Sequence, residues 1–239
     1  METFFYNEIY NNEKEHWWYS TRRKIVHKLI KKYLPKREGL RILDVGCGGG
    51  LLSQELQKYG KTVCIDPSTE AVNFAIQRGV EAEKISIFDY KKEREYDCAV
   101  ALDILEHCYD DSVAIKNIYN LLKPEGIAII FVPALNCFWG HQDVISHHFR
   151  RYTYNDLLNK FKNAGFKPIT QSYFNFFLSP AVYASRKLRN IIKTTPQSEL
   201  TNNNFILNRI GKIIFGLEYY LIPGIKFPFG VSLLGVYKK

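Results

Sequence analysis

The sequence predicts an α/β fold in which helices cover both faces of a mainly parallel β-sheet, and three observations lead to this fold class. Between Arg41 and Val132, short apolar runs alternate with segments of helical periodicity, the pattern that parallel sheets produce. The first apolar run, Ile42 to Val45, leads into the glycine-rich turn Gly46 to Gly50. Several later runs end in an aspartate, at the strand ends where open α/β sheets bind ligands.

Length and composition favour one soluble domain. The chain of 239 residues is long enough for a single α/β domain with added helical segments. No basic and apolar leader opens it, and no apolar run approaches the roughly 18 to 20 residues of a membrane span, so we expect a cytoplasmic protein. Its five cysteines form no C-x-x-C pair, which favours buried thiols in a reducing compartment over a disulfide or zinc framework.

Residues 1–40 are expected to form a helical extension before the first strand. Ser20 or Thr21 is a suitable N-cap for a helix whose apolar residues recur at helical spacing, namely Ile25, Val26, Leu29, Ile30 and Tyr33. Bulky aromatic residues such as Trp18 lie beside the cation of Arg22 at its beginning. Two interpretations remain open, because these aromatic side chains can anchor the helix on the core or form part of a lid over a ligand site.

The glycine-rich turn restricts the class of ligand. Glycine allows the backbone to bend sharply and to approach a ligand closely, and the following helix directs its positive end toward that ligand. A dinucleotide fingerprint that begins at Gly46 requires Gly or Ala at position 51, where this chain has Leu51, and it does not require the acid Asp44. Both features argue against an NAD-dependent oxidoreductase, which we retain as an alternative function.

Two further strands end in residues suited to a nucleoside. The run Lys61 to Ile65 leads into Asp66 and Pro67, and a carboxylate at that strand end can accept hydrogen bonds from both hydroxyls of a ribose. The third strand is predicted over Ile85 to Asp89, where the aromatic ring of Phe88 stands beside an acid. These strand ends are expected to line the same ligand site as the glycine turn.

Two more elements complete the pattern. The apolar run Cys98 to Leu102 stops at Asp103 and is followed by Ile104-Leu105-Glu106-His107. The segment Leu121 to Gly126 reads as a helix end and a turn before a fifth strand, Ile127 to Val132. A glycine-rich turn is a weak signal when it stands alone. Five elements in this order and at this spacing are a much stronger one.

The five elements resemble the motifs of class I S-adenosylmethionine-dependent methyltransferases. Motif I of that family has the form D-x-G-x-G-x-G, which is present here at Asp44, Gly46, Gly48 and Gly50. The resemblance implies a Rossmann-like sheet of seven strands with the last one antiparallel, and S-adenosyl-L-methionine as the cofactor. It places Asp44 and the glycines beside the cofactor's amino end, Asp66 and Pro67 at the ribose, Phe88 and Asp89 at the adenine, and Asp103 beside the methionine part.

A cluster of histidine, arginine and aromatic residues follows the fifth strand and extends the resemblance. It is similar to a bacterial subgroup of these methyltransferases whose segments are matched here by His16 to Tyr19, Arg22-Arg23, His148 to Thr153 and Pro228 to Ser232. One departure is His147, where glycine is commoner. The resemblance covers nearly the whole chain, and it implies a small-molecule, glycan or lipid-linked methyl acceptor.

The same cluster supplies the candidate catalytic and acceptor-binding residues. Methyl transfer needs an aligned nucleophile and, where required, removal of its proton, so His148 and His107 are the candidate bases. A structural hydrogen-bonding role is the alternative for each histidine. The acceptor is expected near Trp18, Arg22, His141, Arg150, Arg151 and Tyr152, because guanidinium groups can bind a carboxylate or a phosphate.

No metal site is expected in this cluster. His141, Asp143, His147 and His148 are residues of the types that bind metals. Adjacent histidines usually point apart, however, and the sequence offers no obvious second set of ligands.

The C-terminal part is expected to complete one domain. Thr153 and Asp156 resemble a capping box at the start of a helix that Gly165 ends, and the last two strands are predicted over Phe166 to Tyr173 and Val231 to Tyr237. The predicted organisation within residues 1–239 is therefore an N-terminal helical lid (1–40), a core (41–173), a helical insertion (174–229) and a last strand (230–239).

The insertion between the last two strands is the most basic part of the chain. Residues 174–229 contain seven Lys or Arg and two Glu, a net charge of +5 out of +9. We expect two amphipathic helices, Pro180 to Ile192 and Ile206 to Leu221, around the polar linker Thr194 to Asn204. Such a basic amphipathic hairpin can cover the sheet or a dimer surface, bind an anionic substrate or lie on an anionic membrane, and these interpretations stay open.

Nucleic acid is a less favoured partner. The isoelectric point of about 9.2 and the many aromatic residues fit an RNA methyltransferase or RNA-binding protein, which we keep as an alternative. Enzymes that methylate the amino groups of bases usually carry an Asn/Asp-Pro-Pro-aromatic tetrad after strand four, where this chain has Asp103-Ile104-Leu105-Glu106. A module that binds the cofactor without catalysis is a further alternative.

Overall fold

A seven-stranded sheet forms the centre of the structure, a computed structural model that describes residues 3–192 and 205–239. The strand order is β3-β2-β1-β4-β5-β7-β6, and β7 runs antiparallel to both of its neighbours while the other pairs are parallel. The predicted Rossmann-like sheet is therefore confirmed. The strands are β1 (Arg41–Val45), β2 (Lys61–Asp66), β3 (Glu81–Lys84), β4 (Tyr96–Leu102), β5 (Leu122–Pro133), β6 (Lys167–Phe174) and β7 (Ser232–Lys238).

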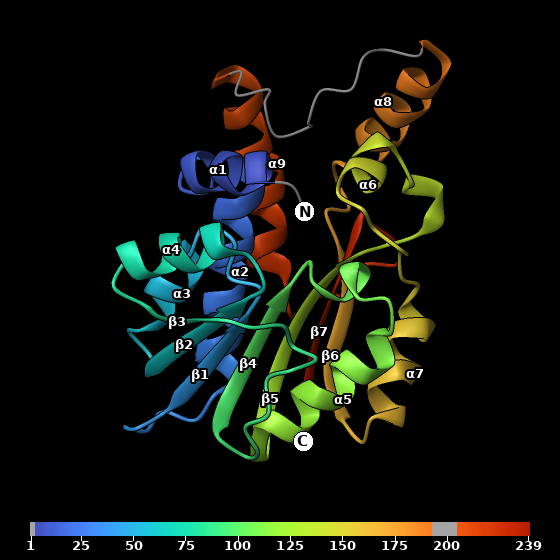
Figure 1. Ribbon diagram of the computed structural model, residues 1–239. Coiled ribbons are helices and arrows are strands. Elements are labelled where there is room, and N and C mark those ends of the chain that lie inside the picture. The colour runs from blue at the N-terminus through green and yellow to red at the C-terminus, as the bar shows by residue number, and fades with distance from the viewer. Residues whose placement is uncertain (1–2, 193–204) are drawn as a thin grey trace.

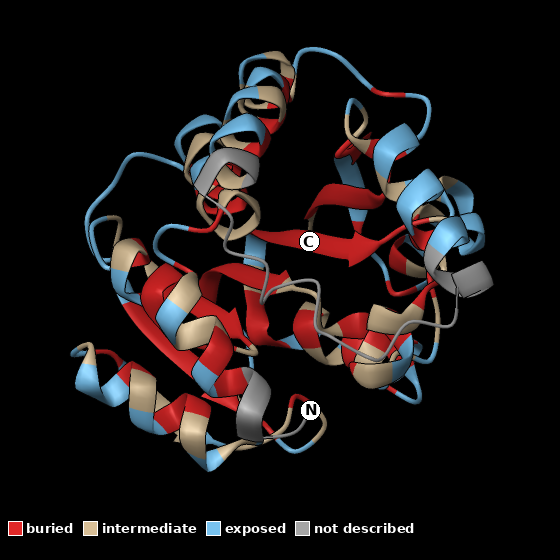
Figure 2. Cartoon of the chain, turned by 90° about the horizontal axis from the view of Figure 1, so that it is seen from above, coloured by how far each residue is buried: buried red, intermediate tan, exposed pale blue. Residues whose placement is uncertain are grey.

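Helices cover both faces of this sheet. On one face lie α5 and α7, and on the opposite face lies α2 with α9 packed against it (Figure 1). Buried residues fill the strands, and exposed residues occupy the outer sides of the helices (Figure 2). The described helices are α1 (Thr3–Asn12), α2 (Trp17–Tyr33), α3 (Leu51–Leu56), α4 (Thr69–Gln77), α5 (Asp111–Leu121), α6 (His141–Ile145), α7 (Tyr154–Asn163), α8 (Ser179–Ile192) and α9 (Phe205–Leu221), with the short 3₁₀ helices η1 (Leu105–His107) and η2 (Asn136–Phe138).

The N-terminal extension is helical, as expected, but its main helix begins earlier than predicted. Neither Ser20 nor Thr21 is the N-cap of α2, because the helix begins at Trp17 and His16 caps it by accepting a hydrogen bond from the Trp18 amide at 3.3 Å. The two tryptophans thus belong to the first turn of α2.

Aromatic stacking explains this early start. The Trp18 ring stacks on Phe215 of α9 and on Phe174 of β6, with centroid distances of 5.4 and 5.9 Å, and Phe215 is fully buried. Burying three stacked aromatic rings favours a helix that begins where the first ring is needed. This stack ties the N-terminal helix to the insertion and to the edge of the sheet.

The predicted third strand is wrong in position. β3 comprises Glu81–Lys84 and pairs with β2, whereas Ile85 to Asp89 forms a turn in which Ser86 accepts backbone hydrogen bonds from Asp89 and Tyr90. The apolar residues of this turn suggested a strand because their side chains pack against the core, although their backbone is not paired. The turn carries Phe88 to the edge of the sheet, where it lines the cavity described below.

The turn predicted before the fifth strand is also shorter than expected. β5 begins at Leu122 and pairs with Tyr96 of β4 there, and the register shifts before Ile127 pairs with Cys98. Glu125 adopts a φ of +69° within this irregular stretch. The Lys-Pro-Glu-Gly sequence therefore forms a bulge inside a strand rather than a separate turn.

The insertion contains the two predicted helices, but they do not form a hairpin. α8 lies on η2 at one side of the sheet edge, and α9 lies along α2 at the other (Figure 1). The expected linker, Thr194 to Asn204, falls outside the described residues. None of the described helices combines the length and the apolar character that crossing a membrane requires.

Candidate functional site

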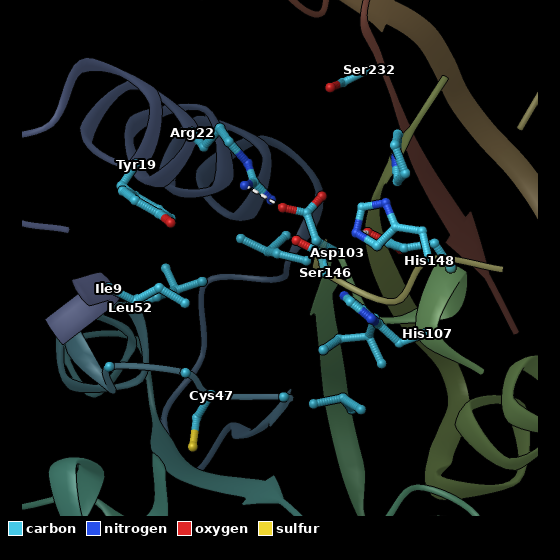
Figure 3. Close-up of a pocket in the computed structure, with 18 of the residues that line it drawn as sticks. Ile9, Tyr19, Arg22, Cys47, Leu52, Asp103, His107, Ser146, His148 and Ser232 are labelled. Carbon is cyan, nitrogen blue, oxygen red and sulfur yellow. Dashed lines mark hydrogen bonds and ion pairs between the residues drawn. The ribbon is translucent and has the colours of Figure 1, made fainter. Parts of the chain in front are cut away.

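A cavity of about 550 Å³ opens at the edge of the sheet where the parallel strands β1, β2 and β4 end. Its walls come from α1 and α2, the glycine turn, the segments after β2, β3 and β4, the α6 region, α8 and the start of β7 (Figure 3). Twelve of the predicted site residues line this cavity: Trp18, Arg22, Asp44, Gly46, Gly48, Asp66, Pro67, Phe88, Asp103, His107, His148 and Arg151.

Two of the glycines in the turn are required by close packing. Gly46 has a φ of +77°, and a Cβ atom there would lie 1.8 Å from Cδ1 of Ile104, in the segment after β4. Gly50 has a φ of +80°, and a Cβ atom there would lie 2.8 Å from Cα of Ala75 in α4. Gly50 therefore serves the packing of α3 against α4 and does not line the cavity, while Gly46 allows the positive φ and leaves room for the Ile104 side chain.

Asp44 and Asp66 present carboxylates at the ends of β1 and β2. Asp44 is buried and accepts a hydrogen bond from Oγ of Ser53 at 2.5 Å. Asp66 accepts hydrogen bonds from the amides of Ser68 at 2.9 Å and Gly48 at 3.4 Å, and from the Tyr6 hydroxyl at 3.4 Å. Burial raises the pKa of Asp44 to about 7 and also raises the pKa of Asp66, so both sites favour a ligand that stabilises the ionised carboxylate.

Phe88 and Asp89 belong to the same turn, but their side chains have different surroundings. Phe88 lines the cavity, but Asp89 is exposed and accepts a hydrogen bond from Oγ of Ser86 at 2.6 Å. Only the aromatic ring of this pair therefore faces the cavity, and the carboxylate lies outside its lining.

Arg22 and Asp103 form an ion pair in the lining of the cavity. Nη1 of Arg22 donates to Oδ2 of Asp103 at 2.5 Å (Figure 3), and the guanidinium lies over the ring of Trp18 at 4.8 Å. Nε and Nη2 of Arg22 are buried and have no hydrogen-bond partner among the described residues. Because buried donors are normally paired, this guanidinium is suited to a carboxylate of a ligand.

His148 lies on the opposite wall, where Asp143 holds it in place. Nδ1 of His148 is 2.9 Å from Oδ1 of Asp143, and the guanidinium of Arg151 donates to both carboxylate oxygens of Asp143 at 2.8 and 3.0 Å. Although burial opposes ionisation, the hydrogen bond from His148 and the charge of Arg151 lower the pKa of Asp143 to about 2. Arg151 therefore positions the carboxylate that positions the histidine.

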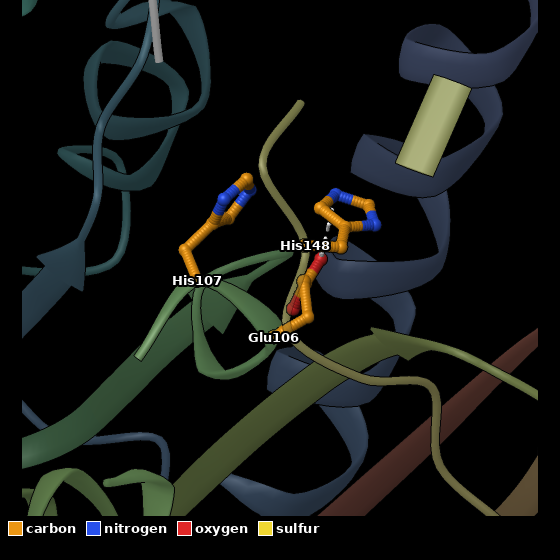
Figure 4. Close-up of side chains that lie close together, drawn as sticks. All are labelled: Glu106, His107 and His148. Carbon is orange, nitrogen blue, oxygen red and sulfur yellow. Dashed lines mark ion pairs between the residues drawn. The ribbon is translucent and has the colours of Figure 1, made fainter. Parts of the chain in front are cut away.

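Glu106 and His107 complete this wall. The His107 ring lies edge-on to the His148 ring, with centroids 4.7 Å apart, and Oε1 of Glu106 lies 4.0 Å from Nε2 of His148 (Figure 4). Burial lowers the pKa of His107 to about 3 and raises the pKa of Glu106 well above its usual range. His107 is thus a neutral imidazole at ordinary pH.

Three of the predicted acceptor-binding residues do not line the cavity. The Tyr152 hydroxyl donates to Asp111 at 2.8 Å from a fully buried ring, and Arg150 forms an ion pair with the same carboxylate at 3.0 Å. These contacts join the loop to α5. His141 is the first residue of α6, and it does not contribute to the cavity lining either.

The sequence interpretation missed several residues that line the cavity. Asp143 appeared only as a candidate metal ligand, and Glu106 was noted without a role. A signal for Glu106 was present, because it lies four residues after the end of an apolar strand and directly before His107. Tyr6 and Glu13, from α1 and the turn that follows it, carried no such signal.

His147, the departure from the subgroup pattern, has a structural explanation. Its φ is +56°, in the left-handed region where glycine is favoured. The side chain is exposed, whereas that of the neighbouring His148 faces the cavity. The two adjacent histidines therefore do point apart, as expected.

Comparison with known proteins identifies similar sequences and folds. A family model described as "Methyltransferase domain" matches residues 17–171. The ubiquinone biosynthesis O-methyltransferase of Rickettsia bellii (strain OSU 85-389) is 32% identical over 108 residues, which cover 42% of this chain and 45% of that protein. The chain thus matches a little under half the length of this curated relative.

Solved structures share the fold at low sequence identity. A putative methyltransferase from Bacillus halodurans is 17% identical with a TM-score of 0.61, and the match covers 90% of this chain and 98% of that one. A putative sarcosine dimethylglycine methyltransferase from Galdieria sulphuraria is 16% identical, also with a TM-score of 0.61, over 92% of this chain and 85% of that one.

Proposed function

The chain belongs to the methyltransferase domain family and has the fold of class I S-adenosylmethionine-dependent methyltransferases, and from this premise we propose that it transfers the methyl group of S-adenosyl-L-methionine to an oxygen or nitrogen of a small-molecule, glycan or lipid-linked acceptor. The observation that carries the proposal is that one cavity unites the carboxylates of Asp44, Asp66 and Asp103 with the His148 wall. A nucleoside site and a proton-accepting group thus face each other.

The residues around the cavity fit this cofactor. Asp66 would accept hydrogen bonds from the ribose hydroxyls, Asp44 would offer negative charge to the amino group, and the ring of Phe88 would contact the adenine. The buried, unpaired donors of Arg22 suit the cofactor's carboxylate, a role we favour over acceptor binding because Arg22 is paired with Asp103. Asp89, being exposed, can reach the adenine amino group only from the rim of the cavity.

The acceptor atom lies beside His148 in this arrangement. The bound cofactor supplies a methyl group on a positively charged sulfur, and the carbon–sulfur bond breaks with its electron pair staying on sulfur as a lone pair of the acceptor forms the new bond. The residues of this chain align the acceptor and govern the proton that leaves it. His148 serves this purpose, because its Nδ1 is occupied by Asp143 and its Nε2 is directed toward Glu106.

The ribose assignment gives the first prediction. Asp66→Ala is expected to weaken binding of S-adenosylhomocysteine by about 1 to 3 kcal/mol, because the hydroxyls lose an acceptor in a buried site. Titration calorimetry measures this change. Asp89→Ala, which removes an exposed carboxylate, is expected to have the smaller effect. Unchanged affinity in Asp66→Ala refutes the ribose assignment.

The pKa of Asp44 gives a second prediction. Because burial raises this pKa to about 7, the carboxyl is increasingly protonated below pH 7 and loses its attraction for the cofactor's ammonium group. Affinity for S-adenosylhomocysteine is expected to fall by up to roughly tenfold per pH unit below about pH 7. Isothermal titration between pH 5.5 and 8 tests this expectation.

Control variants separate Asp44 from the ionisable groups that face it. Asp66 from β2 and Glu13 from the turn after α1 both interact with Asp44 electrostatically. Asp44→Asn is expected to bind more weakly and to lose most of the pH dependence, whereas Glu13→Gln retains it. A steep pH profile in Asp44→Asn would assign the effect to another acid.

Cofactor identity is tested directly by thermal denaturation. Stabilisation by S-adenosylhomocysteine and not by NAD is expected, since Leu51 occupies the position where a dinucleotide fingerprint needs a small residue. Stabilisation by NAD alone would overturn the proposed function in favour of an oxidoreductase.

An apolar acceptor fits the aromatic and aliphatic lining of the cavity. Its lining includes Trp17 and Trp18 of α2 and Val182 of α8, and the relative from Rickettsia bellii is named as an O-methyltransferase of ubiquinone biosynthesis. Incubation with methyl-labelled cofactor and separate lipid, small-molecule, glycan and RNA fractions, followed by mass spectrometry, identifies the acceptor. Label in the lipid or small-molecule fraction supports the proposal, and label confined to RNA contradicts it.

α9 offers a surface that suits contact with a membrane carrying such an acceptor. Ile210, Ile213, Leu217 and Tyr220 recur at helical spacing and are exposed, at 60% for Ile213 and 77% for Tyr220. The exposed Arg209 adjoins them, and the insertion as a whole carries a net charge of +5. An apolar stripe with flanking positive charge favours peripheral contact with anionic lipid.

Vesicle flotation tests this contact. The protein is expected to float with vesicles of phosphatidylcholine and phosphatidylglycerol, and the double substitution Ile213→Glu and Leu217→Glu is expected to abolish flotation. Ile76→Glu, which changes an exposed apolar residue of α4, is the matched control and retains binding. Absence of wild-type protein from the floated fraction at low ionic strength would refute the membrane contact.

A further inference from the structure

Three ligand-type side chains meet on the wall of the cavity opposite the glycine turn. Glu106 and His107 come from η1 after β4, and His148 comes from the loop after α6. One nitrogen from each histidine and one oxygen of Glu106 all lie within 4.8 Å of one another (Figure 4). The sequence alone did not reveal that Glu106 and His107 supply ligand-type side chains beside His148, because His107 lies 41 residues before it in the chain.

Glu106 has no partner that explains its burial. Its side chain is fully buried, and neither carboxylate oxygen accepts a hydrogen bond from another described residue. The closest charged partner is Nε2 of His148 at 4.0 Å, beyond hydrogen-bond distance. A buried carboxylate without a hydrogen-bond partner is costly. The charges of Arg22 and Arg151 act favourably on Glu106 without bonding to it, and a cation between Glu106 and the two imidazoles would lower the cost further.

His148 is oriented as metal-binding histidines are. Nδ1 of His148 bonds to Asp143, so that Nε2 is left as the free ring nitrogen, and the His107 ring lies near the backbone of Ser146. Ligand histidines almost always use the second ring nitrogen to bond a carboxylate or a carbonyl. Asp143 is itself held by Arg151 and by the amide of Gly140 at 2.9 Å.

We propose that Glu106, His107 and His148 bind one divalent cation of the Zn²⁺ type, with an open coordination position toward the cavity. Two imidazoles and one carboxylate are a set of ligands found in catalytic zinc sites, and imidazole favours zinc over magnesium. Zinc ligands at about 2 Å from the ion lie roughly 3 Å from one another. The three side chains therefore move inward by an ångström or somewhat more when the ion binds.

This inference rests on the proposed function and deepens it. An ion at this position faces the acceptor side of the cavity and selects an acceptor that carries a hydroxyl. By lowering the pKa of that hydroxyl it promotes loss of the proton to water, while the methyl group still passes from sulfur to oxygen as written above. His148 then acts as a ligand of the ion rather than as a free base.

Zinc binding by the untagged chain of 239 residues tests the proposal. After treatment with a chelator and its removal, titration with Zn²⁺ is expected to show one site per chain, and Mg²⁺ is expected to bind at least tenfold more weakly. Glu106→Gln and His148→Gln are expected to lower the Zn²⁺ affinity at least tenfold. His147→Asn, which changes the exposed neighbour and keeps a residue that tolerates the left-handed φ of +56°, is expected to bind Zn²⁺ as the wild type does.

A parallel titration with S-adenosylhomocysteine separates this proposal from the proposed function and shows that each variant is folded. A protein that binds S-adenosylhomocysteine but shows no Zn²⁺ site refutes the cation site and leaves the methyltransferase assignment intact. Equal Zn²⁺ affinity in the wild type, Glu106→Gln and His148→Gln also refutes it. Zn²⁺ binding without any affinity for S-adenosylhomocysteine refutes the proposed function and with it the acceptor role of the ion.

Discussion

Asp143→Ala is expected to lower the free energy of unfolding by about 3 to 5 kcal/mol, the cost of removing one partner of a buried ion pair. The side chain of Asp143 is fully buried, and that of Arg151 is 3% exposed. Without Asp143, the guanidinium keeps its charge in the interior and loses both of its carboxylate contacts. Denaturation in urea, with the slope checked for two-state behaviour, measures the change.

Two further variants make this prediction specific. Asp156→Ala removes an exposed carboxylate of α7 and is expected to change stability by less than about 0.5 kcal/mol. The double substitution Asp143→Ala and Arg151→Met removes both charges and is expected to recover part of the loss. If the free energy of unfolding of Asp143→Ala lies within about 1 kcal/mol of the wild type, the ion pair of Asp143 and Arg151 does not stabilise this part of the protein.

His148→Ala is expected to slow methyl transfer by about 10²- to 10⁴-fold, the range for loss of a group that governs proton removal. Affinity for S-adenosylhomocysteine should stay nearly unchanged, because the residues that we propose for the ribose and adenine, Asp66 and Phe88, come from other segments than the loop of His148. Transfer of labelled methyl groups to the acceptor fraction that the wild type modifies measures the rate, and calorimetry measures the affinity.

The neighbouring His147 provides the control for this experiment. His147→Asn changes an exposed side chain at a left-handed position and is expected to retain the wild-type rate. A His148→Ala protein with full activity would exclude His148 from the chemistry, and a loss of cofactor affinity equal to the loss of rate would make its role structural.

Much of the cofactor side of the cavity follows from local patterns. Asp44 and Asp66 were predicted at strand ends because apolar runs of strand length stop there, and parallel strands that share a sheet end at the same edge. The glycine turn was predicted from the glycines themselves, because glycine adopts a positive φ, such as the +77° of Gly46, without strain. These features depend on residues close together in the chain.

The acceptor side was predicted only in part. His148, His107 and Arg151 were expected near the acceptor, and they do line the cavity, but Arg150 and Tyr152 contact Asp111 instead. In the segment His148 to Thr153, the sequence does not predict which side chains face the cavity, because a loop has neither the helical nor the strand periodicity of buried residues. The third strand was misplaced for a related reason, since the apolar side chains of Ile85 to Phe88 pack on the core from an unpaired turn.

The order of strands and helices, the glycine turn and the acidic strand ends were determined by the sequence itself, because hydrophobic periodicity and backbone preferences act over a few residues. The tertiary structure alone decided that Glu106 and His107 face His148, that Asp143 is neutralised by Arg151, and that α9 packs on α2 rather than on α8. These contacts join segments far apart in the chain. Their energy comes from burial and charge pairing, which exist only once the sheet has brought those segments together.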